Sequence, residues 1–136
     1  MILPPAVTVH GRANINAALK PGLPVTLLSA RGAALFAGVS WWRALIADGR
    51  AAFPATPGTD ILDCADAPGR AMAALRAGQR LIVLTPSCPA YAAVAAAGAA
   101  NGATVLPARP ASLDMAARDA QRRLRAWLTA MTGAPS

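Results

Sequence analysis

The chain has 136 residues, of which 55% are hydrophobic and 14% charged, and its formal net charge is +7. This composition excludes a disordered protein, and the length suits one domain with a hydrophobic core of its own. Arginine supplies nearly all of the positive charge and alanine about a quarter of the residues. Because a bias toward arginine and alanine often reflects the nucleotide composition of the genome, it does not by itself predict a nucleic-acid partner.

Apolar and β-branched runs alternate along the chain with segments of helical spacing. In chain order these patterns predict a strand over 6–10, a helix over 13–19, a strand over 24–29, a helix over about 32–53, a strand over 59–64, a helix over 67–77, a strand over 80–85, a helix over about 88–100, a strand over 103–106 and a helix over about 112–131. Gly38 and Gly49 are positions at which the helix over 32–53 can kink or end. Asp66, Ser87 and Ser112 are expected to cap the last three helices.

Strands that alternate with helices indicate parallel pairing through right-handed crossovers. We therefore predict the α/β class, as one three-layer α/β/α sandwich of flavodoxin-like type with a parallel sheet of about five strands. A single domain is expected over 1–131, followed by a flexible tail over 132–136.

Neither a targeting segment nor a membrane span is expected. The first residues lack a basic region, and Pro86 and Pro89 interrupt the long apolar run 81–100. The two cysteines have no metal-ligand spacing, so we expect no metal, no cofactor and a reduced, cytoplasmic compartment.

Four segments of the second half follow one pattern. They are a strand that ends in an acid (DILD, 60–63), a helix (GRAMAALR, 69–76), a strand that ends in threonine (LIVLTPS, 81–87) and a segment before an amphipathic helix (GATVLPARP, 102–110). In this order they resemble the receiver domains of two-component signalling. The resemblance implies that Asp63 stands at the phospho-acceptor position, Thr85 at the switch hydroxyl, and Arg109 where the family has a lysine before proline.

The first predicted strand does not share the resemblance. It ends in His10-Gly11, where receiver domains carry an acidic pair for a metal ion. Without a cluster of carboxylates, Mg²⁺ has too few hard oxygen ligands. The resemblance therefore implies a degenerate module that acts through partner surfaces.

Reactive side chains follow several predicted strands, at the sheet edge where open α/β folds bind ligands. The catalytic candidates are Asp63, Cys88 and His10. Cys88 would begin a helix, where free N–H groups favour a thiolate, and His10 would act as a base beside Asp63 or a thiol. Alternatively, His10 bonds a loop carbonyl and Cys88 is a packed core residue, as expected for Cys64.

The ligand-binding candidates at this edge are Ser29, Arg31, Ser87 and Arg109. Arg31 follows a strand and precedes a glycine and a helix, an arrangement that suits an anion such as phosphate or carboxylate. No nucleotide-binding glycine motif accompanies it.

Interface candidates lie on two helices and comprise Trp41, Trp42, Arg122 and Arg125. Adjacent residues diverge by about 100° on a helix, so one tryptophan should face the core and the other an interface. A homo-oligomer, such as a dimer, or another protein is the expected partner.

Three hypotheses on function remain open. The preferred one is a non-catalytic α/β binding or regulatory module that acts through partner binding or self-association. A second is a small enzyme, or a protein that binds an anionic metabolite, at the carboxyl edge of the sheet. The third, nucleic-acid binding through the basic C-terminal helix, lacks a recognised motif and is not expected.

Overall fold

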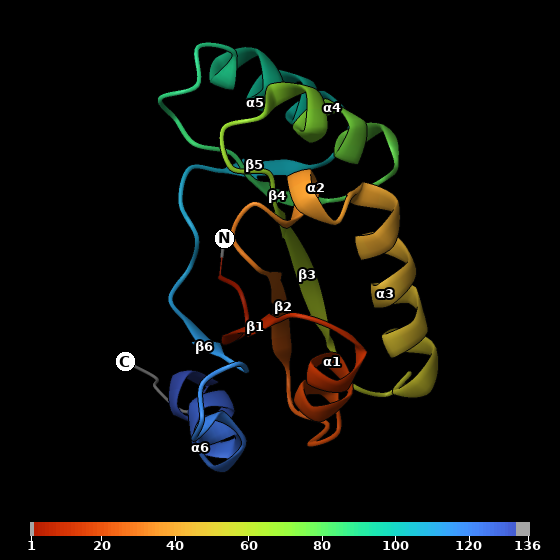
Figure 1. Cartoon of the computed structure of the whole chain (residues 1–136), viewed down its shortest axis with the longest axis vertical. Coiled ribbons are helices and arrows are strands. Elements are labelled where there is room, and N and C mark those ends of the chain that lie inside the picture. Colours follow the sequence, from red (N-terminus) through yellow and green to blue (C-terminus); the bar gives the residue numbers. More distant parts are fainter. Residues whose placement is uncertain (1, 133–136) are drawn as a thin grey trace. The chain divides into compact units, whose positions relative to one another are not determined.

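A computed structural model describes residues 2–132 and shows an α/β protein with a six-stranded parallel sheet of order β5-β4-β3-β2-β1-β6. The elements labelled in Figure 1 are β1 (Ala6–Val9), α1 (Arg12–Leu19), β2 (Val25–Ser29), α2 (Ala33–Phe36), α3 (Val39–Ala52), β3 (Gly58–Asp63), α4 (Pro68–Arg76), β4 (Leu81–Val83), α5 (Tyr91–Ala100), β5 (Thr104–Leu106), β6 (Ser112–Asp114) and α6 (Ala120–Thr132).

The predicted class, a parallel α/β sandwich of flavodoxin-like type, is confirmed, with six strands where about five were expected. Within this class the strand order differs from the 2-1-3-4-5 of flavodoxin itself, because β2 lies between β1 and β3. No helix in the described part of the chain is long and apolar enough to cross a bilayer.

The chain divides into two compact units, which are described separately. Unit 1 comprises Met1–Leu28, Leu45–Asp60 and Pro110–Ser136, and unit 2 comprises Ser29–Ala44 and Ile61–Arg109.

In unit 1, β1 and β6 pair in parallel, with Val7 opposite Leu113. Helix α6 lies beside β6 (Figure 1) and buries Leu124 and Leu128. The indole N–H of Trp127 donates to the carbonyl of Ala6 over 2.7 Å, which ties the same helix to β1. Apolar burial and one directed hydrogen bond together hold α6 in this unit.

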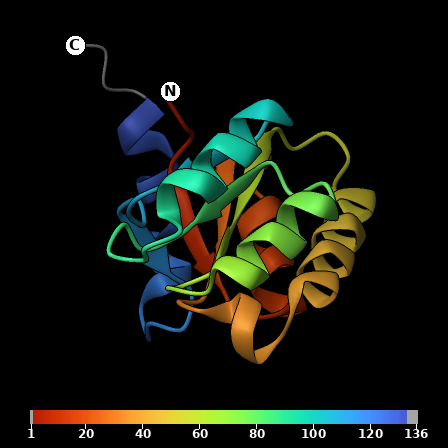
Figure 2. The ribbon, with the colours of Figure 1, turned by 90° about the horizontal axis from the view of Figure 1, so that it is seen from above.

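In unit 2, β4 pairs in parallel with β3 on one side and with β5 on the other. Helices α4 and α5 lie side by side, as Figure 2 shows. Gly98 lets α5 approach β5 closely, because a Cβ at this position would stand 3.1 Å from Cγ2 of Val105. The alanine-rich sequence of α5 suits such close packing.

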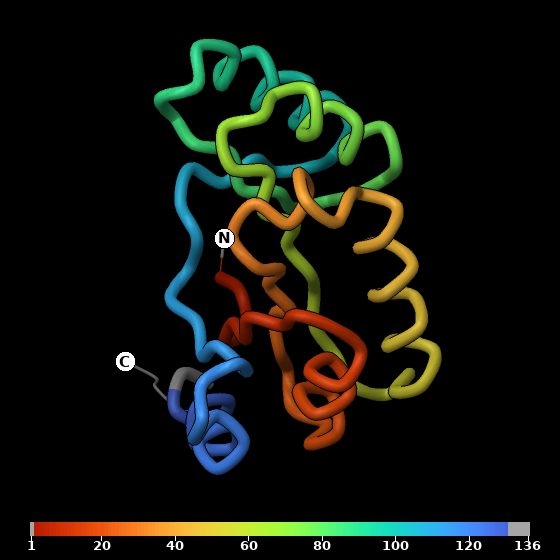
Figure 3. The backbone as a smooth tube through the Cα atoms, viewed as in Figure 1, coloured from red at the N-terminus to blue at the C-terminus, as the bar shows by residue number. Residues whose placement is uncertain are grey.

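The long helix predicted over 32–53 is wrong, because the structure has α2 and α3 in its place. Gly38 adopts a φ of 98°, a left-handed conformation that ends α2 and redirects the chain before α3 begins (Figure 3). The sequence signal at Gly38 was therefore a break.

The helix predicted from residue 112 is also wrong. Residues 112–114 form β6, and α6 begins only at Ala120. The Thr8 and Ser112 hydroxyls lie 2.7 Å apart, so Ser112 bonds across the β1–β6 pair instead of capping a helix.

The two other predicted caps are wrong as well. The N-cap residues of α4 and α5 are Ala67 and Ala90, and neither makes a side-chain capping bond, so Asp66 and Ser87 do not cap these helices. Of the tail predicted over 132–136, Thr132 ends α6 and the rest lies outside the described residues.

The tryptophan pair of α3 is split between core and boundary. Trp42 is 0% exposed, so the predicted interface role is wrong for this residue, whereas Trp41 is half-buried. Their ring centroids lie 6.1 Å apart. The other two interface candidates, Arg122 and Arg125, are exposed.

Candidate functional site

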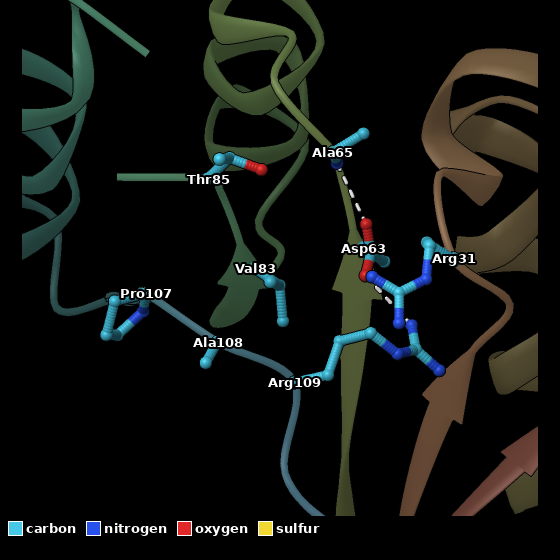
Figure 4. Close-up of a pocket in the computed structure, with 8 residues that line it drawn as sticks. All are labelled: Arg31, Asp63, Ala65, Val83, Thr85, Pro107, Ala108 and Arg109. Carbon is cyan, nitrogen blue, oxygen red and sulfur yellow. Dashed lines mark hydrogen bonds and ion pairs between the residues drawn. The ribbon is translucent and has the colours of Figure 1, made fainter. Parts of the chain in front are cut away.

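Unit 2 contains a pocket of about 420 Å³ at the carboxyl ends of its strands (Figure 4). Asp63 ends β3, Thr85 follows β4, and Arg31 follows β2. The residues that line the pocket are Arg31, Asp63, Ala65, Val83, Thr85, Pro107, Ala108 and Arg109. Parallel strands bring these side chains to one edge, as the sequence predicted for Asp63, Arg31 and Arg109.

The carboxylate of Asp63 is held from two sides and is only 2% exposed. Its Oδ1 accepts the backbone N–H of Gly32 over 3.0 Å and that of Ala65 over 2.8 Å. Its Oδ2 accepts Nη1 of Arg109 over 2.8 Å, and Figure 4 shows this contact beside the one to Ala65. The buried charge is thus both paired and hydrogen-bonded, as burial of a carboxylate requires.

Ser29 and Arg109 fix the position of Asp63. The Ser29 hydroxyl oxygen accepts the backbone N–H of Asp63 over 2.9 Å, and its own proton goes to the Ala30 carbonyl. Nη1 of Arg109 also donates to the Ser29 carbonyl over 3.0 Å. Both residues were predicted to bind a ligand, and in the structure both support Asp63.

Two backbone positions that sequence reasoning did not assign to the site complete it. Gly32 and Ala65 have φ angles of 71° and 50°, so both lie in the left-handed region and present their N–H groups to Asp63. A glycine directly after a strand-end arginine is a usable sequence signal for such a conformation. An alanine provides none, because left-handed alanine is uncommon.

Arg31 is the charge of the pocket that has no partner among the described residues. It is exposed and makes neither an ion pair nor a hydrogen bond with the residues that the structure describes. Asp63 offsets the charge of Arg109, and Arg31 adds a further positive charge. The residues that line the pocket therefore carry one positive charge in excess. Together with the Thr85 hydroxyl, this arrangement can bind a small oxyanion through charge-assisted hydrogen bonds.

His10 lies outside this pocket, in unit 1. Its Nε2 stands 2.6 Å from Oδ1 of Asp114, and its backbone N–H donates to the side chain of Asn14. The pairing expected with Asp63 is therefore wrong, as is the alternative bond to a loop carbonyl, because the imidazole pairs with Asp114.

Cys88 and Ser87 follow β4 but do not line the pocket. The placement of Cys88 at the start of a helix is wrong, because α5 begins three residues later, at Tyr91. Cys88 is buried, and Ser87 is exposed. The expected meeting of Asp63, Cys88, His10 and Arg31 thus reduces to Asp63 and Arg31.

Cys64 is a core residue, as predicted, with 0% exposure. Burial, and secondarily the neighbouring charge of Asp63, raise the pKa of its thiol to about 12. A thiol with this pKa is almost wholly protonated at neutral pH and is no nucleophile.

We expect both cysteines of the native protein to resist alkylation by iodoacetamide at pH 7.5, reacting at least ~100-fold more slowly than glutathione, since only an exposed thiolate reacts. Mass spectrometry of the modified protein measures the rate. Unfolding in guanidinium should restore normal reactivity at both positions. A native thiol that reacts as fast as glutathione would show that one cysteine is activated.

The described residues contain no group of three His, Cys, Asp or Glu side chains that could hold a metal ion. No protein-family model and no curated protein matches the sequence.

Proposed function

We propose that this protein is a non-catalytic α/β binding module that holds a small oxyanion, a phosphate or a carboxylate, in the pocket beside Arg31. The observation that carries the proposal is that Arg31 lines the pocket with no partner among the described residues. The other two charges of the pocket, on Asp63 and Arg109, neutralise each other. An unpaired guanidinium in a concave site is the usual partner of an oxyanion.

The hydrogen bonding of Asp63 and the protonation of Cys64 support binding rather than catalysis. Both oxygens of Asp63 already accept hydrogen bonds, so neither is free to attack a substrate without breaking a buried contact. The raised pKa of Cys64 keeps its thiol protonated. A group held this rigidly acts as part of a scaffold for the charge of Arg31.

The degenerate receiver-like interpretation is kept as part of this proposal for its side chains alone, because the strand order differs from the 2-1-3-4-5 of receiver domains. Asp63, Thr85 and Arg109, the positions that carry the resemblance, all line this pocket. The pocket contains no second carboxylate, so a bound phosphate would rely on arginine and hydroxyl groups instead of Mg²⁺. Partner binding by such a module is part of the same proposal.

Isothermal titration with inorganic phosphate, and separately with acetate, tests the proposal and distinguishes the two anions. We expect Arg31→Ala to weaken binding of the preferred anion about 10- to 100-fold, because one charged hydrogen-bond donor is lost. Arg31→Lys should retain part of the affinity, since it keeps the charge but not the planar fork. Mg²⁺ should leave the phosphate affinity unchanged.

The matched control is Arg70→Ala, which removes the same charge from the exposed surface of α4 in the same unit. This variant should bind the anion as the unmodified protein does. An equal loss in Arg70→Ala, or no binding of either anion at millimolar concentration, would refute the anion pocket.

A further inference from the structure

The charges of unit 1 are distributed unevenly over its surface. Each of its four aspartates lies against a basic side chain: Asp48 lies 3.0 Å from Arg12, Asp60 3.2 Å from Arg50, Asp119 3.6 Å from Arg123 and Asp114 2.6 Å from His10. The cations of this unit that make no ion pair with a described residue are Lys20, Arg118, Arg122 and Arg125. All four are exposed.

These four residues, termed the basic face, belong to α6, the turn before it and the end of α1. Arg122 and Arg125 stand about one turn apart on α6, where Arg122 points away from the buried Leu124 and Leu128 and Arg125 lies at the flank of this buried stripe. Lys20 and Arg125 line one hollow of about 380 Å³, together with Gln121. Arg122 lines a second hollow of about 380 Å³, beside Trp127.

We propose that the basic face binds the phosphodiester backbone of a nucleic acid without reading its base sequence. Several cations without an ion-pair partner complement a polymer that carries one charge per phosphate, and the acid beside them, Asp119, is paired with Arg123. Arginine predominates, and its guanidinium matches a phosphate in shape as well as in charge. This proposal is independent of the pocket around Arg31, which lies in unit 2.

The positions of the exposed apolar residues favour a nucleic acid over a membrane or an acidic protein as the partner of the basic face. The large apolar side chains exposed in the described part of the chain are Ile2, Leu35 and Phe36, and none belongs to α1 or α6. A helix that enters a bilayer interface presents apolar residues to it, and a protein interface usually has an apolar core. A surface on which arginine supplies most of the charge is typical of contacts with phosphates.

Binding through phosphates makes the affinity depend steeply on salt. Each neutralised phosphate on duplex DNA contributes about −0.9 to the slope of log K against log salt concentration. Three or four contacts therefore give a slope of about −3 to −4, and the affinity should fall roughly 100-fold between 50 and 200 mM salt.

Fluorescence anisotropy with a labelled duplex of about 20 base pairs, in KCl from about 20 to 200 mM, tests this proposal across the salt range in which phosphate contacts weaken. We expect the full chain to bind with the slope given above. Arg122→Ala/Arg125→Ala should lower the steepness by about 2 and weaken binding more than ~10-fold at 50 mM KCl. These residues are exposed, so the variant should fold, as circular dichroism can verify.

The control is Arg70→Ala/Arg76→Ala, which removes two exposed arginines from α4 in unit 2 and lowers the net charge equally. This variant should keep the original slope. The proposal is overturned if the duplex fails to bind at 20 mM KCl, or if both double variants lose slope equally. Tighter binding to phosphatidylserine vesicles or to poly-glutamate than to DNA overturns it as well.

Discussion

Gly58→Ala is expected to destabilise the protein by about 3 kcal/mol or more, as measured by urea unfolding at pH 7. Gly58 begins β3 with a φ of 150°, in a region of backbone conformation that is nearly confined to glycine. A Cβ there would stand 1.9 Å from the carbonyl oxygen of Val25. The two backbones approach so closely that no rotamer change can relieve the overlap, so one strand must move.

Two other glycines separate the steric effect from the loss of glycine itself. Gly22 has a φ of 74° but open space around its Cβ position, so Gly22→Ala should cost only about 1–2 kcal/mol. Gly69 lies in the first turn of α4, also with open space, and Gly69→Ala should be neutral or stabilise by up to ~1 kcal/mol. If Gly58→Ala lowers the free energy of unfolding no more than Gly22→Ala does, the backbone of β3 does not approach residue 25 as closely as the structure shows.

The same local chemistry explains how much of the fold could be predicted from the sequence. The β-branched runs of β1 and β2 and the proline and glycine stops around α1 are properties of neighbouring residues, so their approximate positions could be predicted. The three-residue β6 could not, because Ser112–Asp114 become a strand only by pairing with β1. Strand pairing is a tertiary property, and a polar start such as Ser112 resembles a helix cap equally well.

The candidate site divides in the same way. Arg31, Asp63 and Arg109 follow predicted strands, so parallel topology alone indicated that they would meet. The N–H of Ala65 was not predictable, because its φ of 50° depends on the turn that follows β3 and alanine does not indicate it. The partner of His10 depended on β6, so Asp114 could not be identified before that strand was known.

The second large effect is expected at the ion pair of Asp63 and Arg109. Their side chains are 3% and 16% exposed, so Arg109→Met would leave a buried carboxylate without its cation. We expect a loss of about 3–5 kcal/mol in the free energy of unfolding. By comparison, Arg123→Met removes one partner of an exposed pair, with side chains 55% and 42% exposed, and should cost at most ~1 kcal/mol.

A double-mutant cycle shows whether the loss arises from the buried charge or from packing. Asp63→Asn keeps Oδ1 as an acceptor for Gly32 and Ala65 but turns an amide donor toward Arg109, so it should also destabilise the protein, by about 2–3 kcal/mol. In Asp63→Asn/Arg109→Met no buried charge remains, so the combined loss should fall short of the sum by about 2 kcal/mol or more. Additive losses would mean that Arg109 stabilises unit 2 through its contact with the Ser29 carbonyl and its aliphatic chain, and that Asp63 needs only its two backbone donors. If the two losses are instead coupled, the charges of Asp63 and Arg109 cancel within the pocket, and Arg31 supplies its excess positive charge.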